Sequence, residues 1–206
     1  MNVEIVPNGV NLELFKKNQN WGKKPPVILI SNNFKWLQNV EAANILLNEI
    51  FPLVRLEVPD AKVLIVGQHI PQSIMNRAGK NIEIRSLAED DVAGVAKAYS
   101  EATVFASPVK GPGGTRLKNL AAMASQLPMV TTSVGAAGLD ITPDVHVLLA
   151  EDPQNFSKQL VRIIKNPKLA RKLAENGRNH VEKNFDYAVI AEKLSKIYQS
   201  LNVKKP

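Results

Sequence analysis

A glycine-rich turn followed by two cations is the part of this sequence whose residue types could do chemistry. Residues 111–118 read GPGGTRLK and run directly into an apolar helical pattern over residues 115–127. Glycine tolerates positive φ and lets a ligand approach the backbone closely, and the free amides at a helix start attract anions. Arg116 and Lys118 oppose the helix dipole there, at a cost of about 0.3–1 kcal/mol each. A bound phosphate or diphosphate would turn this repulsion into attraction, because an arginine can hold two phosphate oxygens at once.

The same residues also fit a purely structural turn. Glycines are common between a strand and a helix, and both cations could simply be solvated. The sequence contains no GxxxxGK[ST] loop, and no GxGxxG follows the first predicted strand, so neither a Walker loop nor an NAD site is indicated. Local residue types therefore leave a diphosphate site and a structural turn as two open interpretations.

The elements that would position this turn alternate between strands and helices. Several of the predicted strands are continuously apolar rather than alternating, which is typical of a parallel sheet covered on both faces. Helical patterns separate them, and the first of these is interrupted by Pro52. We therefore expect an α/β fold with a Rossmann-like, doubly wound parallel sheet of about six strands. The expected strands are residues 26–32, 61–67, 81–86, 103–109, 128–134 and 146–151, and the expected helices between them are 39–56, 90–101 and 115–127.

The chain changes character after residue 152, where the strands stop and basic helices begin. Pro153 and Pro167 suit the first turn of a helix, and Asp186 suits a helix cap. The acidic run EDD at 89–91 resembles an acidic pair for acid–base work or a divalent-ion site, but it fits a helix cap better. We expect a single domain over residues 1–206. It divides into a leading segment (1–25), a Rossmann-like core (26–152) and C-terminal helices (153–206).

Composition and charge limit the classes of function. The 206 residues carry a formal net charge of +7, which favours anionic partners, and they include no cysteine, which excludes disulfides and thiolate chemistry. His69, His146 and His180 are far apart in sequence with no carboxylate framework, so no metal site is expected. Aromatic residues make up only 5% of the chain, and no nucleic-acid partner is expected. No apolar run approaches the roughly 20 residues that a membrane helix needs.

Four segments resemble the C-terminal domain of group 1 (family 4) glycosyltransferases. VEIVPNGVNLELF (3–15) is similar to the segment that enters that domain, and GGTRLKNLAAMASQLPMVTTSVGAAGLD (113–140) is similar to the GGTRLK-type donor segment. NVEAANILLNEIFPLVRLEVPDAKVLIVG (39–67) and FDYAVIAEKLSKIY (185–198) match the expected helix, strand and closing helix. The resemblance covers nearly the whole chain.

This resemblance implies the donor-binding half of a GT-B enzyme. Such enzymes are typically retaining and metal-independent, and we expect transfer of a hexose-type sugar from a nucleotide-diphosphate sugar to a glycan or lipid-linked acceptor, in polysaccharide biosynthesis. No cofactor is implied beyond the donor substrate. Because VPNGVN lies at residues 6–11, we expect the acceptor-binding N-terminal domain to be missing and this chain alone not to transfer sugar. The implied location is the cytoplasm, with peripheral contact to the inner face of a membrane left open.

The resemblance also assigns donor contacts to individual positions. Gly113, Gly114 and Thr115 would present amides to the diphosphate, and Arg116 and Lys118 would neutralise it. Ser107 would shape the strand exit beside the sugar, while Ser86 and Leu87 would place backbone groups near the base. No catalytic residue is assigned.

Two positions depart from the family pattern. Many relatives carry two glutamates at the places that read Gly113 and Ala121 here, and the second glutamate accepts hydrogen bonds from the ribose; glycine at the first place is normal for the GGTRLK type. Losing the second carboxylate would cost about 1.5–3 kcal/mol of donor affinity. Many relatives also supply an arginine and a lysine near the exit of the first strand, where Lys35 is the candidate substitute. The alternative function is therefore a degenerate, non-catalytic GT-B domain that acts as an interaction module.

Overall fold

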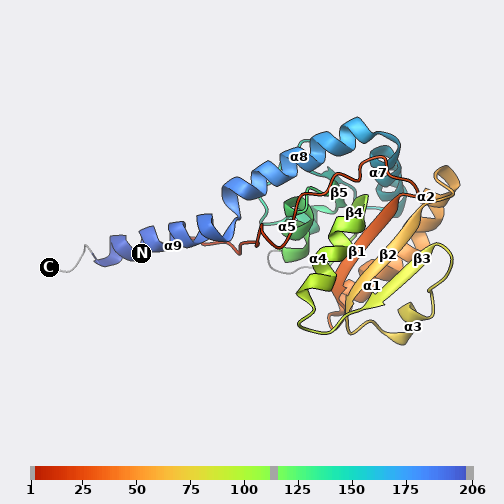
Figure 1. Ribbon diagram of the computed structural model, residues 1–206, viewed down its shortest axis with the longest axis horizontal. Coiled ribbons are helices and arrows are strands. Elements are labelled where there is room, and N and C mark those ends of the chain that lie inside the picture. The colour runs from red at the N-terminus through yellow and green to blue at the C-terminus, as the bar shows by residue number, and fades with distance from the viewer. Residues whose placement is uncertain (1–2, 112–115, 203–206) are drawn as a thin grey trace.

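The chain folds around a six-stranded, all-parallel sheet. A computed structural model describes residues 3–111 and 116–202 (Figure 1). The strand order is β3-β2-β1-β4-β5-β6, the doubly wound order in which the direction of progression reverses beside the first strand. The expected Rossmann-like sheet is therefore confirmed. The strands are β1 (Val27–Asn33), β2 (Lys62–Gln68), β3 (Ile82–Ser86), β4 (Val104–Ser107), β5 (Met129–Thr131) and β6 (Leu148–Leu149).

Helices cover both faces of the sheet, as the continuous apolar strands predict. Successive side chains of β1 alternate between two hydrophobic clusters: Ile28 and Ile30 belong to one, and Leu29 belongs to the other. The first cluster is completed by α1, η1, α2 and α7, and the second by α4 and α5, while α8 contributes residues to both. The helices are α1 (Leu37–Ile45), η1 (Leu46–Ile50), α2 (Phe51–Glu57), α3 (Gln72–Met75), α4 (Val92–Glu101), α5 (Leu117–Ala124), α6 (Ser133–Ala136), α7 (Pro153–Lys165), α8 (Pro167–Asn184) and α9 (Tyr187–Asn202).

The interruption expected at Pro52 is a local widening of the helix. α1, η1 and α2 follow one another without a break, and η1 is a π-helical turn that ends just before Pro52. Proline has no amide hydrogen, and its ring clashes with the carbonyl four residues earlier, which is Asn48 in this turn. A wider turn accommodates the ring, so the helix continues.

Side-chain caps begin several of the helices. Asp91 accepts a hydrogen bond from the Gly94 amide at 2.8 Å and starts α4, which confirms the expected cap. Asp152 and Asn166 cap α7 and α8 in the same way, with Pro153 and Pro167 in the first turns as predicted. The short helices α3 and α6 were not expected from the apolar pattern, because four residues are too few to show a helical period.

The described start of the leading segment lies beside the last helix, and the two project from the body of the domain (Figure 1). Val10 forms a parallel bridge with Asp186, and Lys193 Nζ donates to the Ile5 carbonyl at 2.7 Å. Further along, Asn18 is buried, and its amide donates to the carbonyls of Tyr99 and Ala102. These bonds attach residues before the first strand to the core.

Candidate functional site

A cleft of about 810 Å³ opens at the carboxyl ends of β1 and β2, beside the start of α5. This is the edge at which open parallel sheets bind ligands. Among the described residues that line the cleft, two are cations, Arg116 and Lys118, and none is an aspartate or glutamate. The lining residues are Asn8–Asn11, Leu14, Phe15, Ser31, Asn32, Asn33, Trp36, Gln38, Asn39, Gly67, Gln68, Val95, Tyr99, Arg116–Lys118, Ala121 and Tyr187.

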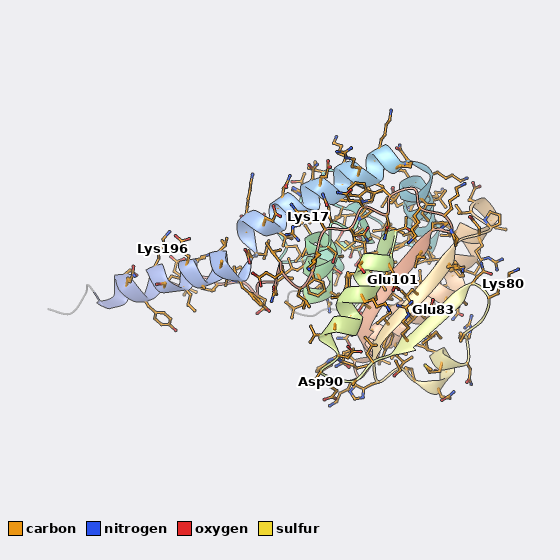
Figure 2. The ribbon with its side chains drawn as sticks, viewed as in Figure 1. Lys17, Lys80, Glu83, Asp90, Glu101 and Lys196 are labelled. Atoms are coloured by element: carbon orange, nitrogen blue, oxygen red, sulfur yellow. The ribbon has the colours of Figure 1, made fainter. Side chains whose placement is uncertain are left out.

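Acidic side chains near the sheet form ion pairs outside the cleft. Glu83 on β3 and Glu101 on α4, both labelled in Figure 2, each lie 2.6 Å from the Arg85 guanidinium. On the projecting helix α9, Lys196 pairs with Glu192 at 2.7 Å (Figure 2). The cleft therefore has an unbalanced positive charge among its described lining residues, although the surrounding surface has paired charges.

Arg116 is the buried N-cap residue of α5. Its side chain is only 9% exposed, and Nη2 donates to the Gly111 carbonyl at 2.7 Å. The Nε atom is buried and has no hydrogen-bond partner among the described residues. An unpaired buried donor on a charged group is costly. An anion in the cleft could satisfy this donor, and this interpretation agrees with the predicted role of Arg116 in binding phosphate.

Lys118 lies two residues further along, part-buried in the cleft wall. Its Nζ donates to Asn39 Oδ1 at 2.8 Å and to Asn32 Oδ1. Burial, and secondarily the neighbouring Arg116 guanidinium, lowers the pKa of Lys118 from its ordinary value of 10.5 to about 7. Neither partner carries a negative charge, so an anion that enters the cleft would be the first full counter-charge that Lys118 meets among the described residues.

The two asparagines that hold Lys118 were missed by reasoning from the sequence. Asn32 is buried at the end of β1, and Asn39 lies in the first turn of α1, where its own amide donates to the Asn33 carbonyl at 2.7 Å. The available signal was the polar run SNNFKWLQN directly after an apolar strand. Lys35, the candidate substitute for family cations near this exit, is exposed and does not line the cleft; amides surround Lys118 instead.

The other predicted donor contacts lie around this centre or outside the described residues. Gly113, Gly114 and Thr115 lie outside the described residues. Ser107 is buried at the end of β4, and its Oγ has no partner in the described part of the chain. Ser86 and Leu87 follow β3; the Leu87 amide already donates to the Gly67 carbonyl at 2.8 Å, which leaves its carbonyl for a base. Ser107, Ser86 and Leu87 are not among the residues that line the cleft.

Ala121 lies one helical turn after Lys118, in an apolar wall of the cleft. It is 5% exposed and belongs to the same hydrophobic cluster as Tyr99, with Phe15 and Val95 packed against that cluster. Tyr99 stacks on Phe105 and donates from its hydroxyl to the Lys118 carbonyl at 3.1 Å, so it supports the start of α5. No described carboxylate lines the cleft to take the place of the family's second glutamate at Ala121.

The three histidines lie against other side chains of the protein. His69 pairs with the exposed Glu89 at 2.9 Å, and the rings of His146 and His180 pack 4.7 Å apart. Nowhere in residues 3–111 and 116–202 do three His, Asp or Glu side chains gather as metal ligands would. The described helices also include none that is both long enough and apolar enough to cross a bilayer.

Comparisons with known proteins agree with the fold. The family model for glycosyl transferases group 1 matches residues 25–166, and the chain belongs to this family. Its Rossmann-like sheet is that of the C-terminal half of a GT-B fold. The GGTRLK subgroup remains a prediction.

Two curated relatives show the extent of the sequence similarity. The chain is 26% identical over 167 residues to an uncharacterized 44.6 kDa protein in the cps region of Klebsiella pneumoniae, covering 77% of this chain and 42% of that protein. It is 25% identical over 158 residues to the GDP-mannose-dependent monoacylated alpha-(1-6)-phosphatidylinositol monomannoside mannosyltransferase of Corynebacterium glutamicum, covering 72% and 42%. The chain thus matches about two fifths of the length of these relatives.

Solved structures share the fold over almost all of the chain. Sucrose-phosphate synthase from Thermosynechococcus elongatus superposes with a TM-score of 0.76 at 23% identity, covering 98% of this chain and 53% of that one. Anabaena Alr3699/HepE in complex with UDP-glucose gives 0.75 at 15% identity, covering 96% and 57%.

Proposed function

We propose that this chain binds the diphosphate of a nucleotide-sugar donor, as the donor half of a retaining, metal-independent glycosyltransferase. The observation that carries the proposal is the pair of buried or part-buried cations in the cleft, Arg116 and Lys118, which have no carboxylate partner among the described residues. Family membership and a strand order with its cleft at the carboxyl edge support the same ligand class.

The proposed chemical role of these residues is to stabilise the leaving group. When the bond between sugar and diphosphate breaks, negative charge grows on the diphosphate, and donors fixed beforehand stabilise that charge most effectively. Arg116 would supply its unpaired Nε–H, and Lys118 its ammonium. Gly113, Gly114 and Thr115 would add amides, Ser107 would adjoin the sugar, and Ser86 and Leu87 would adjoin the base.

The proposed acceptor is inferred from the names of the relatives. The Corynebacterium glutamicum relative is named for mannosyl transfer to a phosphatidylinositol monomannoside, and the Klebsiella pneumoniae relative is encoded in a cps region. We accordingly propose a hexose-type sugar, a glycan or lipid-linked acceptor, and a role in polysaccharide biosynthesis. Nucleotide sugars are cytoplasmic metabolites, so the proposed site of action is the cytoplasm, at the inner face of a membrane when the acceptor is a lipid.

Calorimetric titration tests donor binding directly. The chain is titrated with UDP-glucose, GDP-mannose and ADP-glucose, and saturable binding of at least one is expected. Arg116→Ala should weaken that binding about 10- to 100-fold, because it removes charge-assisted hydrogen bonds worth about 1.5–3 kcal/mol. Lys172→Ala, at an exposed lysine on α8, is the matched control and should bind as the parent does. Absence of binding by all three donors at millimolar concentration contradicts the proposal.

Ala121 favours the alternative function, a non-catalytic GT-B domain that acts as an interaction module. Among the described residues, the apolar wall around Ala121 has no carboxylate to accept the ribose hydroxyls. If the chain still binds donors and only this contact is lost, Ala121→Glu should tighten donor binding by about 10-fold or more. If the cleft has lost donor binding altogether, neither the parent nor Ala121→Glu will bind any of the three nucleotide sugars, and the interaction module becomes the better explanation.

A further inference from the structure

Trp36 lines the cleft at the N-cap of α1 and is largely exposed. It is 59% exposed, although tryptophan is highly buried on average because its ring is large and mostly apolar. Trp21, the other tryptophan of the chain, follows this rule and packs against the first hydrophobic cluster. Trp36 therefore gives the cleft an apolar surface that a ligand could cover.

Backbone hydrogen bonds fix the segment that carries Trp36. Just before it, Phe34 is buried, and its amide donates to the Gln68 carbonyl at 2.9 Å. The Trp36 carbonyl accepts from the Asn39 amide at 3.0 Å, and the Asn39 side chain donates to the Asn33 carbonyl at 2.7 Å. The chain on both sides of Trp36 is thus in place before a ligand arrives, so little backbone ordering opposes binding.

Neutral amide side chains share the cleft wall with Trp36. Asn33, Gln38, Asn39 and Gln68 all line the cleft. A carboxamide offers two donors and an acceptor, so it suits hydroxyl groups, which also donate and accept. A pyranose ring combines such hydroxyls at its rim with a face of C–H groups, and that face gains by leaving water for an aromatic surface. A tryptophan among amides therefore matches an uncharged sugar ring.

The cations of the cleft lie close to this segment. Asn39, which is bonded to the Trp36 carbonyl, accepts from Lys118 Nζ through its Oδ1 at 2.8 Å. In a nucleotide sugar the sugar is bonded directly to the diphosphate, so a diphosphate at Lys118 would hold a sugar near Trp36. The proposed base contacts, Ser86 and Leu87, follow β3, which β2 separates from β1. The order of the strands thus separates the proposed base position from Trp36.

We propose that Trp36 is a sugar-binding residue. Its indole ring stacks on the C–H face of a pyranose, and the amides of Asn33 and Gln38 bind hydroxyls at the rim of that ring. The pyranose is the sugar of the donor or a sugar of a glycan acceptor, and both present the same chemistry. This inference rests on the proposed function and adds to it a residue that recognises the sugar.

Calorimetry with and without the sugar tests contact with the donor. The parent and Trp36→Ala are titrated with UDP, GDP and ADP, and with UDP-glucose, GDP-mannose and ADP-glucose. For the base that binds, Trp36→Ala should bind the nucleotide sugar about 10-fold more weakly than the parent, because it cannot cover the apolar face of the ring. It should bind the nucleoside diphosphate as the parent does. Equal weakening of both ligands would mean that Trp36 contacts the nucleotide, and it would overturn the inference.

Tyr198→Ala is the matched control for this substitution. Tyr198 is an aromatic residue of nearly equal exposure, 60%, and lies on α9 outside the cleft lining. Its removal should leave both affinities at the parent values. Thermal unfolding of Trp36→Ala should also match that of the parent, because the side chain it removes is exposed.

Fluorescence tests the acceptor as the source of the ring. In Trp21→Phe, Trp36 is the remaining tryptophan, and the indole removed has an Nε1 without a hydrogen-bond partner among the described residues. If the ring belongs to an acceptor, Trp36→Ala should keep the parent's affinity for nucleotide sugars. Methyl α-glucoside or methyl α-mannoside should then shift the emission of Trp36 in Trp21→Phe, and the shift should saturate.

The two measurements separate this inference from the proposed function. Unchanged donor affinity in Trp36→Ala together with unchanged Trp36 emission overturns the inference and leaves the function intact. Absence of binding by every nucleotide and nucleotide sugar contradicts the function. In that case the emission decides the inference by itself: a saturable shift with either glycoside supports sugar binding at Trp36, and no shift overturns it.

Discussion

Replacing Lys118 by methionine should stabilise the folded chain in the absence of ligand, although it removes a residue of the proposed donor site. Methionine has a similar length and carries no charge to bury. The expected gain arises because Lys118 has a pKa of about 7 in the folded chain but an ordinary value of 10.5 when exposed. The folded state therefore disfavours the charged form of this side chain, whereas the unfolded state accepts it freely.

The size of the effect follows from this difference. At about 1.4 kcal/mol for each pH unit, the span from 10.5 to about 7 corresponds to at most about 5 kcal/mol against the charged amine. Methionine forfeits the hydrogen bonds to Asn32 and Asn39, each worth about 0.5–1.5 kcal/mol, and water in the open cleft reduces the penalty further. We expect a net stabilisation of about 1–3 kcal/mol at pH 6–7.

The pH dependence provides the sharper test. The unfolded chain binds a proton on Lys118 that the folded chain lacks between pH 7 and about 10, so the stability of the parent should rise relative to Lys118→Met across that window. Urea denaturation of both proteins at pH 6, 7.5 and 9, without phosphate in the buffer, measures the difference. It should be largest at pH 6 and shrink towards pH 9, while Lys172→Met should match the parent throughout. The reasoning would be refuted if Lys118→Met were less stable than the parent at pH 6. It would also be refuted if the difference in the free energy of unfolding did not change with pH.

Three further changes test the scaffold and the setting of the cleft. Gly67→Ala should prevent normal folding or cost several kcal/mol, because the added Cβ would lie 1.7 Å from the Asn32 carbonyl oxygen; thermal unfolding close to that of the parent would contradict this packing. Tyr99→Phe removes the 3.1 Å hydrogen bond to the Lys118 carbonyl and should lower the free energy of unfolding by about 0.5–1.5 kcal/mol in urea, and no change would mean that the hydroxyl does not support α5. With a net charge of +7, the chain should sediment with vesicles rich in anionic lipid at low salt and be released as salt rises; sedimentation that does not depend on lipid charge would argue against electrostatic contact.

Much of the fold was predictable because it depends on local patterns. Continuous apolar runs marked β1 and β2, since a strand buried on both faces needs apolar side chains at most positions. The edge strand β3 was marked instead by alternating residues between turn signals. Caps such as Asp91 and first-turn prolines such as Pro153 act within a few residues of themselves. The π-helical turn before Pro52 was visible only as an interruption, because the sequence does not show whether a helix breaks or widens at a proline.

The candidate site was only half predictable from the sequence. The sequence by itself placed Arg116 and Lys118 after a strand exit and at a helix start, because both features are local to residues 103–127. Only the tertiary structure decided the state of Lys118: its partners Asn32 and Asn39 are 86 and 79 positions away in the chain. They reach it because β1 and β4 are neighbours in the parallel sheet and end at the same edge. The charge of a buried amine depends on every group packed around it. The order of the strands in the sheet, rather than distance along the sequence, determines which groups those are.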